Sequence, residues 1–473
     1  GHAQASVAGK GVRRMSVFSL SNLKKTWYYL QKNGIRNAVW AVLERIGQEQ
    51  EVYTWQEPDE KTLSFQREHS ASLRISIVVP AYRTKKEHLE AMLNSVSRQS
   101  YPHWELIVAD AGGTAESVQA WAKKNGICLR EAADASNLAE WKDQSIVLCT
   151  LSENKGISAN TNAGIELAAG DAVGLLDHDD LLTANALWEM ADCLEKEKKR
   201  GKQKLVLFSD EDKCDKAASR FYEPNFKPDF DGEMLLTNNY ICHFTVIETA
   251  FLKELKLRSG FDGAQDYDLM LRAYAAGGQF VHVPKVLYHW RCHEASTASN
   301  PQSKRYAYEA GQRALEDYCL RKGWKATVSG LKHLGFYRED YEDSVFCQRP
   351  EIGIWAKPLP GGRDVFGIRH PKGFLVSGLY ENDGSMRYAG LRKGYSGPMH
   401  RAALQQSAPA ADLRSMEVCS ALKERYAQTI AELKEACQGL PTAAQETKIL
   451  QKSMEFCKEA TAAGYGILWD PQA

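Results

Sequence analysis

The sequence predicts an α/β protein built around a mostly parallel sheet. Three observations lead to this class. Short apolar runs alternate with amphipathic segments from about residue 72 onward, the runs are rich in β-branched residues, and several end in acidic residues. Such alternation forms βαβ units, whose parallel strands are covered by helices on both faces. An N-terminal helical segment and a smaller C-terminal region, either α/β or helical, complete the expected architecture.

The predicted elements follow one another in a regular order. "ISIVVPAY" (75–82) is expected to be a strand because of its β-branched residues, and a helix with one apolar face follows over 85–99. Next come strand 104–110, a helix near 115–124, strand 145–149, a helix from Ser158 to Gly170, strand 172–176, a helix over 183–198 and strand 204–212. Beyond residue 220 we expect a strand at 238–248, a helix at about 264–276, two short strands around Pro284 and a polar loop suited to a mobile lid.

Composition narrows the class of protein. The chain has 473 residues, enough for two or three domains, and its 60 Lys plus Arg balance 60 Asp plus Glu, which is not expected of a general nucleic-acid binder. The 11 cysteines are odd in number and never spaced as Cys-x-x-Cys, so we expect reduced thiols. No apolar run approaches about 18 residues and no signal peptide is recognisable, which predicts a cytoplasmic location.

Acidic residues crowd the end of one predicted strand. In "AVGLLDHDDLLTANAL" (172–187) the apolar run stops at Asp177-His178-Asp179-Asp180. Like charges this close repel one another and require a compensating cation, although an aspartate at this point could instead cap the following helix. Asp110 and the acids 210–212 also end strands, and ligands of open α/β sheets bind at the carboxyl edge.

The chemistry of this edge suits a divalent cation. Carboxylates with a nearby imidazole are ligands for Mg²⁺ or Mn²⁺. The sequence has no Walker A motif and no Gly-x-Gly-x-x-Gly after a strand, so phosphates would be neutralised by a metal rather than held by a glycine loop. Asp266 and Asp268 fall in the first turn of a predicted helix, where they either favour the helix dipole or supply a general base.

Seven stretches in order carry a family resemblance. "ISIVVPAYRT", "ELIVAD", "NKGISANTNAGIELAAGD", "LLDHDDLL", "FSDEDK", "GAQDYDLMLR" and "VPKVLYHWR" resemble the motifs of family 2 glycosyltransferases, most closely of bacterial members that build O-antigen or rhamnan-type cell-surface polysaccharides. The resemblance covers roughly residues 71 to 330. It implies a Rossmann-like GT-A fold, a UDP- or dTDP-linked sugar donor, Mn²⁺ or Mg²⁺, and transfer of a hexosyl or deoxyhexosyl group with inversion to a growing or lipid-linked glycan.

The resemblance also implies roles for particular residues. Pro80, Tyr82 and Asp110 match positions that surround the nucleotide, and Lys155 and Gly156 match the loop that approaches it. Relatives often read Tyr-Asn and Asp-Asp-x-Ser where this chain has Tyr82-Arg83 and 110–113 as Asp-Ala-Gly-Gly, which leaves the base selectivity open.

A second group of matched residues belongs to the reacting end of the donor. Asp177 is expected near the ribose and Asp179 at the metal, while Asp266 matches the catalytic base and Arg291 is expected to reach the diphosphate. His289 resembles a second metal contact, with a buried structural histidine as the alternative. His243 lies on the expected acceptor side, with a packing role as its alternative.

Two further regions flank the predicted transferase domain. We expect an N-terminal helical segment at 1–70, the transferase domain at 71–335 and a C-terminal accessory region at 336–473. Residues 16–47 form a basic amphipathic stretch with tryptophans that would lie on the inner face of the cytoplasmic membrane or pack on its own domain. Residues 453–471 align without a gap on 266–284, and 378–390 resemble part of a second transferase module. The C-terminal region is therefore interpreted as a non-catalytic remnant that binds acceptor or makes a homo-oligomer contact, with a coincidental match of helix, glycine and strand as the alternative.

Two other functions stay open at this point. A non-catalytic glycan-binding or scaffold protein could keep the same fold, although the acidic residues speak against it. A nucleotidyltransferase also uses acids and a metal on an α/β sheet, and it would release pyrophosphate from a nucleoside triphosphate.

Overall fold

The computed structural model describes residues 53–132, 141–292, 305–330, 335–356 and 416–436, together with part of 452–469. The chain divides into two units, residues 1–51 and 52–473, and the described residues all belong to the second. The basic stretch 16–47, most of the polar loop after residue 291 and the stretch 378–390 lie outside the described residues.

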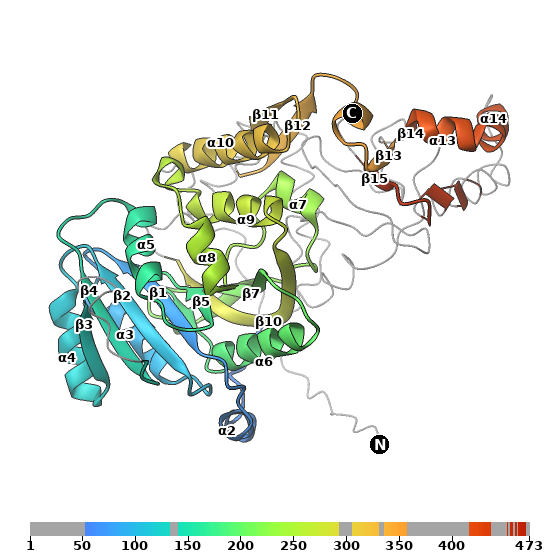
Figure 1. Cartoon of the computed structure of the whole chain (residues 1–473). Coiled ribbons are helices and arrows are strands. Elements are labelled where there is room, and N and C mark those ends of the chain that lie inside the picture. The colour runs from blue at the N-terminus through green and yellow to red at the C-terminus, as the bar shows by residue number, and fades with distance from the viewer. Residues whose placement is uncertain are drawn as a thin grey trace, which may run out of the picture. The chain divides into compact units, whose positions relative to one another are not determined.

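One large sheet forms the centre of the fold (Figure 1). Its strands run in the order β3-β4-β2-β1-β5-β9-β7-β10-β6, with β8 paired to β7. The strands are β1 (Ile75–Ala81), β2 (Trp104–Asp110), β3 (Cys128–Ala132), β4 (Ser145–Thr150), β5 (Ala172–Leu175), β6 (Leu181–Leu182), β7 (Leu205–Cys214), β8 (Phe221–Asn225), β9 (Thr245–Glu248) and β10 (Gln279–Arg291). Strand β9 lies antiparallel between β5 and β7, so β7 and β10 keep the direction of β1 to β5. The predicted mostly parallel α/β class is confirmed.

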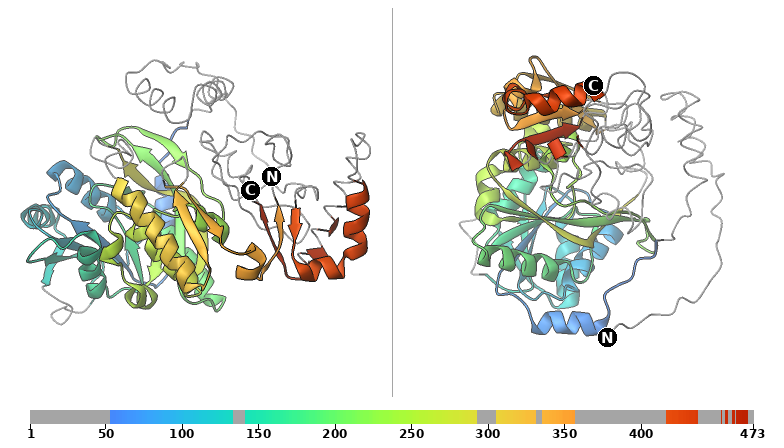
Figure 2. Two further views of the ribbon diagram at one scale, coloured as in Figure 1. Left: turned by 90° about the horizontal axis from the view of Figure 1, so that it is seen from above. Right: turned by 90° about the vertical axis from the view of Figure 1, so that its right-hand side faces the viewer.

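Helices cover both faces of this sheet, and each face has its own core (Figures 1 and 2). One core contains residues of α5 (Ile157–Leu167), α7 (Gly232–Thr237), α8 (Thr249–Leu255), α9 (Gln265–Ala275) and α10 (Arg305–Arg321). The other contains residues of α3 (Lys86–Ser97), α4 (Ala115–Asn125) and α6 (Ala186–Lys199). Every residue of β2 is buried, as expected of a strand covered on two faces.

The register of the central strands brings their carboxyl ends together. Ala81 of β1 pairs with Asp110 of β2, and Val78 pairs with Leu175 at the end of β5. The acidic stretch 177–180 is the turn between β5 and β6, and β6 pairs antiparallel with β10. The acids therefore lie at the edge where ligands bind in such sheets.

The structure differs from the predicted elements at two places that matter for the site. The strand predicted at 238–248 begins only at Thr245, and the residues before it form an irregular segment after α7. The two strands predicted around Pro284 are one strand, β10, whose register against β7 shifts between Val283 and Tyr288. A proline lacks the amide hydrogen that a regular ladder uses, so the shift accommodates it within one strand.

Segments that precede and follow the sheet in sequence contact the helices that cover it. The helix α2 (Glu60–Glu68) begins at an Asp59 cap, and Gln66 donates to Glu189 of α6 at 3.4 Å. The predicted boundary at residue 335 falls between two paired strands, β11 (Ala326–Gly330) and β12 (Tyr337–Tyr341). Tyr337 stacks on Tyr267 of α9, so the core of the central domain includes β12.

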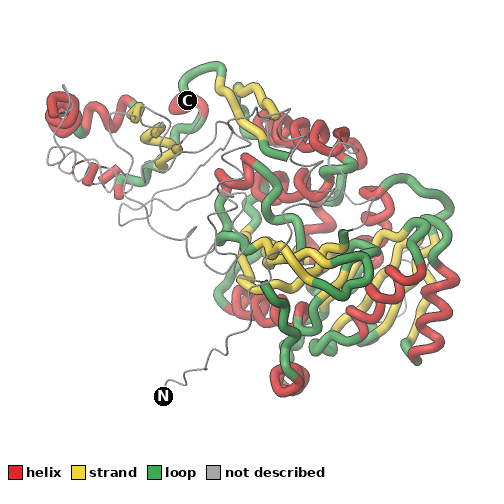
Figure 3. Tube along the Cα trace, turned by 180° about the vertical axis from the view of Figure 1, so that it is seen from behind, coloured by secondary structure: helices red, strands yellow, loops and turns green. Residues whose placement is uncertain are grey.

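The C-terminal residues form a small three-stranded sheet, seen among the other elements in Figure 3. Strand β13 (Ile352–Ala356), which follows α11 (Val345–Gln348), pairs antiparallel with β14 (Met416–Val418) and parallel with β15 (Gly466–Trp469), and α13 (Ser420–Arg425) and α14 (Ala427–Ala436) follow β14. In the register of the predicted repeat, the buried Leu269 and Ala273 of α9 fall on Phe456 and Ala460, which are also buried. None of the helices in the described part of the chain combines the length and apolar character that a membrane crossing needs.

Candidate active site

The turn 177–180 is fixed by strand β10. The carboxylate of Asp180 accepts the Tyr288 hydroxyl at 2.6 Å and the backbone N–H of Arg291 at 2.7 Å, and only 1 % of Asp180 is exposed. The Arg291 Nε also donates to the backbone oxygen of Asp179 at 2.5 Å. Burial, and then the charges of Asp179 and Asp177, raise the pKa of Asp180 well above its ordinary value.

His243 faces this turn from the irregular segment before β9. Its Nε2 lies 3.8 Å from Asp177 Oδ2, and its Nδ1 lies 3.1 Å from Glu211 Oε2 on β7. The Tyr288 ring stacks on the imidazole with centroids 4.6 Å apart. Burial lowers the pKa of His243, but neighbouring Cys242 and Glu211 outweigh it and hold that pKa well above the usual range. The imidazolium therefore supplies part of the positive charge that the crowded acids require.

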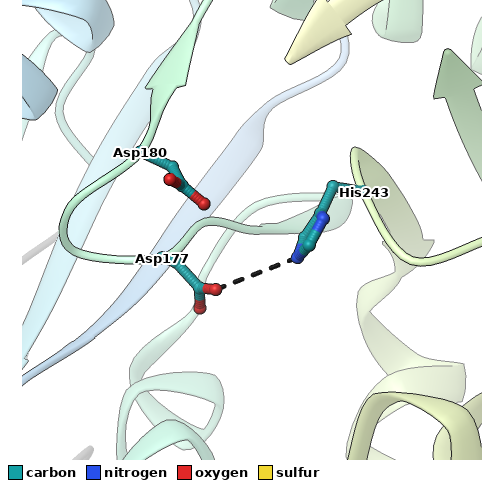
Figure 4. A group of neighbouring side chains, drawn as sticks. All are labelled: Asp177, Asp180 and His243. Atoms are coloured by element: carbon teal, nitrogen blue, oxygen red, sulfur yellow. Dashed lines mark ion pairs between the residues drawn. The ribbon is translucent and has the colours of Figure 1, made fainter. Parts of the chain in front are cut away.

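Asp177, Asp180 and His243 form a group that could hold a cation (Figure 4). Each offers one ligand atom, and these atoms all lie within 4.8 Å of one another. Two carboxylate oxygens and an imidazole nitrogen are a suitable donor set for Mn²⁺, and the carboxylates also suit Mg²⁺. The residues present therefore fit the divalent cation that the sequence predicts. His243 must lose its extra proton before its nitrogen can bind a metal.

Asp266 and Asp268 of α9 have different surroundings. Asp268 is buried, and its carboxylate forms ion pairs with Arg258 and Arg272. Asp266 is only half-buried and accepts a hydrogen bond from Asn239 Nδ2 at 2.8 Å. The carboxylate of Asp268 is thus held by two arginines, whereas that of Asp266 is partly exposed.

The irregular segment before β9 connects this carboxylate with the cation group. Asn239 contacts Asp266, and the thiol of Cys242 lies 3.5 Å from Asp266 Oδ2. The same sulfur lies 3.6 Å from His243 Nε2. The five residues 239–243 therefore contact Asp266, the predicted base, and include His243 of the cation group.

Asp179 and His289, the predicted metal residues, do not belong to this group. Asp179 is half-buried, and its backbone oxygen binds Arg291. The Nδ1 of His289 lies 2.5 Å from Asp212 Oδ1. The rings of Trp55 and Phe221 pack on the imidazole, with centroid distances of 4.9 and 4.3 Å respectively. Its Nε2 is buried and has no hydrogen-bond partner among the described residues.

The residues predicted to surround the nucleotide lie where β1 and β2 end. Pro80 is half-buried in β1, and Tyr82 is 40 % exposed with the Arg83 guanidinium 5.0 Å from its ring centroid. Asp110 is almost fully buried, and its oxygens accept the backbone N–H groups of residues 112, 114 and 115. Tyr82 thus offers an open aromatic surface, while Asp110 shapes the loop beside it.

The remaining predicted donor contacts lie on two loops. Lys155 is exposed and pairs with Glu153 at 3.1 Å. Gly156 caps α5 with φ of +95°, a backbone conformation that favours glycine. Arg291 is 2 % exposed; beyond its contacts with the 177–180 turn it donates to the Lys216 carbonyl at 2.7 Å, and its Nη2 has no hydrogen-bond partner among the described residues.

Sequence reasoning missed several contributors to the site. Asp180 and Glu211 stand inside quoted motifs, "LLDHDDLL" and "FSDEDK", yet were given no individual role. Asn239 had a usable signal, since it lies four residues before His243 in the same segment. Tyr288 stands in a third quoted motif, "VPKVLYHWR", and was likewise given no individual role.

Comparisons with known proteins find similar sequences and one similar chain of known structure among others. Two curated relatives are an uncharacterized protein, y4gI, of Sinorhizobium fredii (36 % identity, 53 % of this chain, 26 % of the relative) and the O-antigen biosynthesis protein RfbC of Myxococcus xanthus (34 % identity, 54 % of this chain, 19 % of the relative). This chain thus spans about a quarter or less of the length of either. A crystal structure of Staphylococcus aureus TarS residues 1–349 with UDP aligns with 52 % of this chain and 66 % of that chain, at 18 % identity and a TM-score of 0.38.

The family model of glycosyl transferase family 2 matches residues 76–255. This range contains β1 to β9, the acidic turn 177–180 and the segment that carries His243. It ends shortly before Asp266, which follows on α9. The chain therefore carries a family 2 glycosyltransferase domain.

Proposed function

We propose that this chain is a metal-dependent, inverting glycosyltransferase. It moves a hexosyl or deoxyhexosyl group from a nucleoside-diphosphate donor, UDP- or dTDP-linked, to a hydroxyl of a bacterial surface polysaccharide or lipid-linked glycan. The observation that carries the proposal is the meeting of Asp177, Asp180, His243 and Asp266 around one segment at the carboxyl edge of the sheet. The relationship to an O-antigen biosynthesis protein supports the acceptor class.

The cation group faces the leaving diphosphate in this proposal. Asp177, Asp180 and His243 would hold Mn²⁺ or Mg²⁺, which supplies positive charge for the developing diphosphate. Asp179 and His289 remain the alternative ligand pair predicted from the sequence. The role of Arg291 is to hold the 177–180 turn through its backbone N–H and Nε contacts, with Nη2 left for a donor oxygen.

Asp266 is the proposed general base. A single displacement requires a base for the attacking hydroxyl and a stabilised leaving group, and it inverts the anomeric centre. The hydroxyl oxygen forms a bond to the anomeric carbon while the bond to the diphosphate breaks, and the hydroxyl proton passes to the Asp266 carboxylate. Asn239 and Cys242 fix the position of Oδ2, one of the two carboxylate oxygens.

The nucleotide would lie where β1 and β2 end. Tyr82 offers an exposed ring for a base, and Pro80, Asp110, Lys155 and Gly156 stay predicted contacts of the donor. Contact with the inner face of the cytoplasmic membrane through 16–47, acceptor binding by the C-terminal region and a homo-oligomeric contact also stay predictions.

A thermal-shift panel tests the proposal. UDP, dTDP, GDP and CMP are added to the full chain with and without Mn²⁺, beside Asp180→Asn and Asp179→Ala. A ligand that binds the folded chain raises its melting temperature by mass action. We expect one nucleotide to give a metal-dependent shift that Asp180→Asn loses, whereas loss only in Asp179→Ala would favour the alternative ligand pair. No shift with any nucleotide would favour a glycan-binding scaffold.

A further inference from the structure

A buried ion pair lies directly behind His243. Lys227 is fully buried, its Nζ lies 3.6 Å from Glu211 Oε2, and the Glu211 side chain is 8 % exposed. Burying two charges is costly unless further hydrogen bonds satisfy them. Lys227 Nζ also donates to the backbone oxygens of Ile241, at 2.6 Å, and His243. The pair is therefore tied to the segment that carries His243.

Both carboxylate oxygens of Glu211 have polar neighbours, and each oxygen has different ones. Its Oε1 accepts the Asn225 side-chain amide at 3.2 Å, and its Oε2 lies 3.1 Å from His243 Nδ1 and 3.6 Å from Lys227 Nζ. The carboxylate is thus held as an acceptor for the Nδ1 hydrogen.

This bond decides which imidazole nitrogen faces the cation group. Because Nδ1 donates to Glu211, Nε2 is left on the side of Asp177, 3.8 Å from Oδ2. Tyr288 stacks on the ring and restricts its rotation. Histidines that bind metals usually donate their other ring N–H to a carboxylate, which fixes the tautomer and the ring orientation. The arrangement around His243 has this form.

We propose that Glu211, anchored by Lys227, is a positioning residue that presents His243 Nε2 as the nitrogen ligand of the divalent cation held with Asp177 and Asp180. The inference rests on the proposed function and deepens it. A positioning role of Glu211 differs from that of a purely structural ion pair in one respect. The effect of Glu211 on cation binding passes through His243 and through no other residue.

Mn²⁺ titration of the full chain, followed by the electron paramagnetic resonance signal of free Mn²⁺, tests this inference. We expect Glu211→Ala to weaken Mn²⁺ binding roughly 10–100-fold, the usual effect of removing such a partner. Glu211→Gln keeps an acceptor oxygen and is expected to lose less. In a His243→Ala background, adding Glu211→Ala should change the Mn²⁺ affinity by less than about twofold, because a double-mutant cycle isolates the coupling of the two residues.

A matched control separates positioning from stability. Glu233 has the same 8 % side-chain exposure and pairs with Arg349, and neither residue belongs to the cation group. Glu233→Ala is expected to lower the melting temperature while leaving Mn²⁺ affinity unchanged. If Glu211→Ala does not fold, as judged by circular dichroism, the Glu211→Gln variant and its double with His243→Ala give the same comparison.

The outcomes distinguish this inference from the proposed function. Unchanged Mn²⁺ affinity in Glu211→Ala, or an equal loss with and without His243, would overturn the positioning role and leave the glycosyltransferase proposal intact. A wild-type chain that binds no Mn²⁺ would overturn both the positioning role and the metal dependence.

Discussion

Two aspartates of α9, two residues apart, should respond to substitution in opposite ways. Asp268 is 1 % exposed, and its Oδ2 accepts Arg258 Nε at 3.1 Å and Arg272 Nε at 2.9 Å. Arg258 Nη2 donates to the other oxygen. Asp266 is half-buried and accepts hydrogen bonds from Asn239 Nδ2 at 2.8 Å and from the weaker Cys242 thiol donor at 3.5 Å. Asp268→Ala and Asp266→Ala therefore remove very different sets of contacts.

The expected magnitudes follow from these contacts. Removing one partner of a buried charged network costs about 3–5 kcal/mol. Arg258 keeps Asp317, and Arg272 keeps the backbone oxygens of residues 255 and 256, so the loss in Asp268→Ala should not exceed this range. At about 2–4 °C per kcal/mol for a domain of this size, the melting temperature should fall by roughly 6–20 °C. Asp266→Ala removes the partly exposed hydrogen bond from Asn239, worth about 1 kcal/mol, and the weak one from the Cys242 thiol.

Thermal unfolding of the full chain, followed by circular dichroism, measures both effects, and sugar release from the donor is measured beside it. We expect Asp268→Ala to lose stability, and Asp266→Ala to keep its stability within about 1 kcal/mol while losing turnover. If Asp268→Ala unfolds no earlier than Asp266→Ala, the assignment of structural and catalytic roles within α9 is wrong.

Three further predictions concern stability. Arg349→Met leaves Glu233 buried without its partner and should lower the free energy of unfolding, measured by chemical denaturation, by about 3–5 kcal/mol. Adding Glu233→Gln should restore part of this loss, and purely additive effects of the two substitutions would refute the pairing. Burial, and then the charge of Glu233, raise the pKa of Glu339 from 4.5 to about 8. Between these pH values the folded state binds a proton that the unfolded state has lost, so the free energy of unfolding should fall as the pH rises. In Glu339→Gln the melting temperatures at about pH 5 and about pH 9 should therefore lie closer together than in the wild type. Gly156→Ala, at φ +95° with a neighbouring carboxylate in the way, should cost roughly 1–3 kcal/mol, more than Gly201→Ala, at φ +81° in open space.

The sequence predicted the sheet because its strands are locally marked. "ISIVVPAY" and "WELIVAD" combine β-branched residues with burial on both faces, and both form strands with nearly the predicted bounds. Strand β3 was not predicted, because "CLREA" (128–132) is a half-exposed edge strand with a weak apolar pattern. Edge strands depend on pairing with a neighbour rather than on their own composition.

The acidic turn was found from sequence, but its partners were not. The amino-acid sequence itself shows the cluster of acidic residues at 177–180, and the strand order brings that turn to the carboxyl edge of the sheet. His243 was given only a packing or acceptor-side role, because a strand was predicted where the chain forms an irregular segment. Glu211 and Lys227 contact His243 from positions distant in sequence, which no periodicity reveals.

The most direct test of the central claim is sugar release from the donor by the full chain, with water as acceptor. Release of the nucleotide from its UDP- or dTDP-linked sugar is measured with and without Mn²⁺, for the wild type, Asp180→Asn and Asp266→Asn, beside nucleotide binding. We expect Mn²⁺-dependent release by the wild type, loss of both binding and release in Asp180→Asn, and binding without release in Asp266→Asn. Equal release by wild type and Asp266→Asn would contradict the proposed base, and no release with any donor would contradict the enzyme.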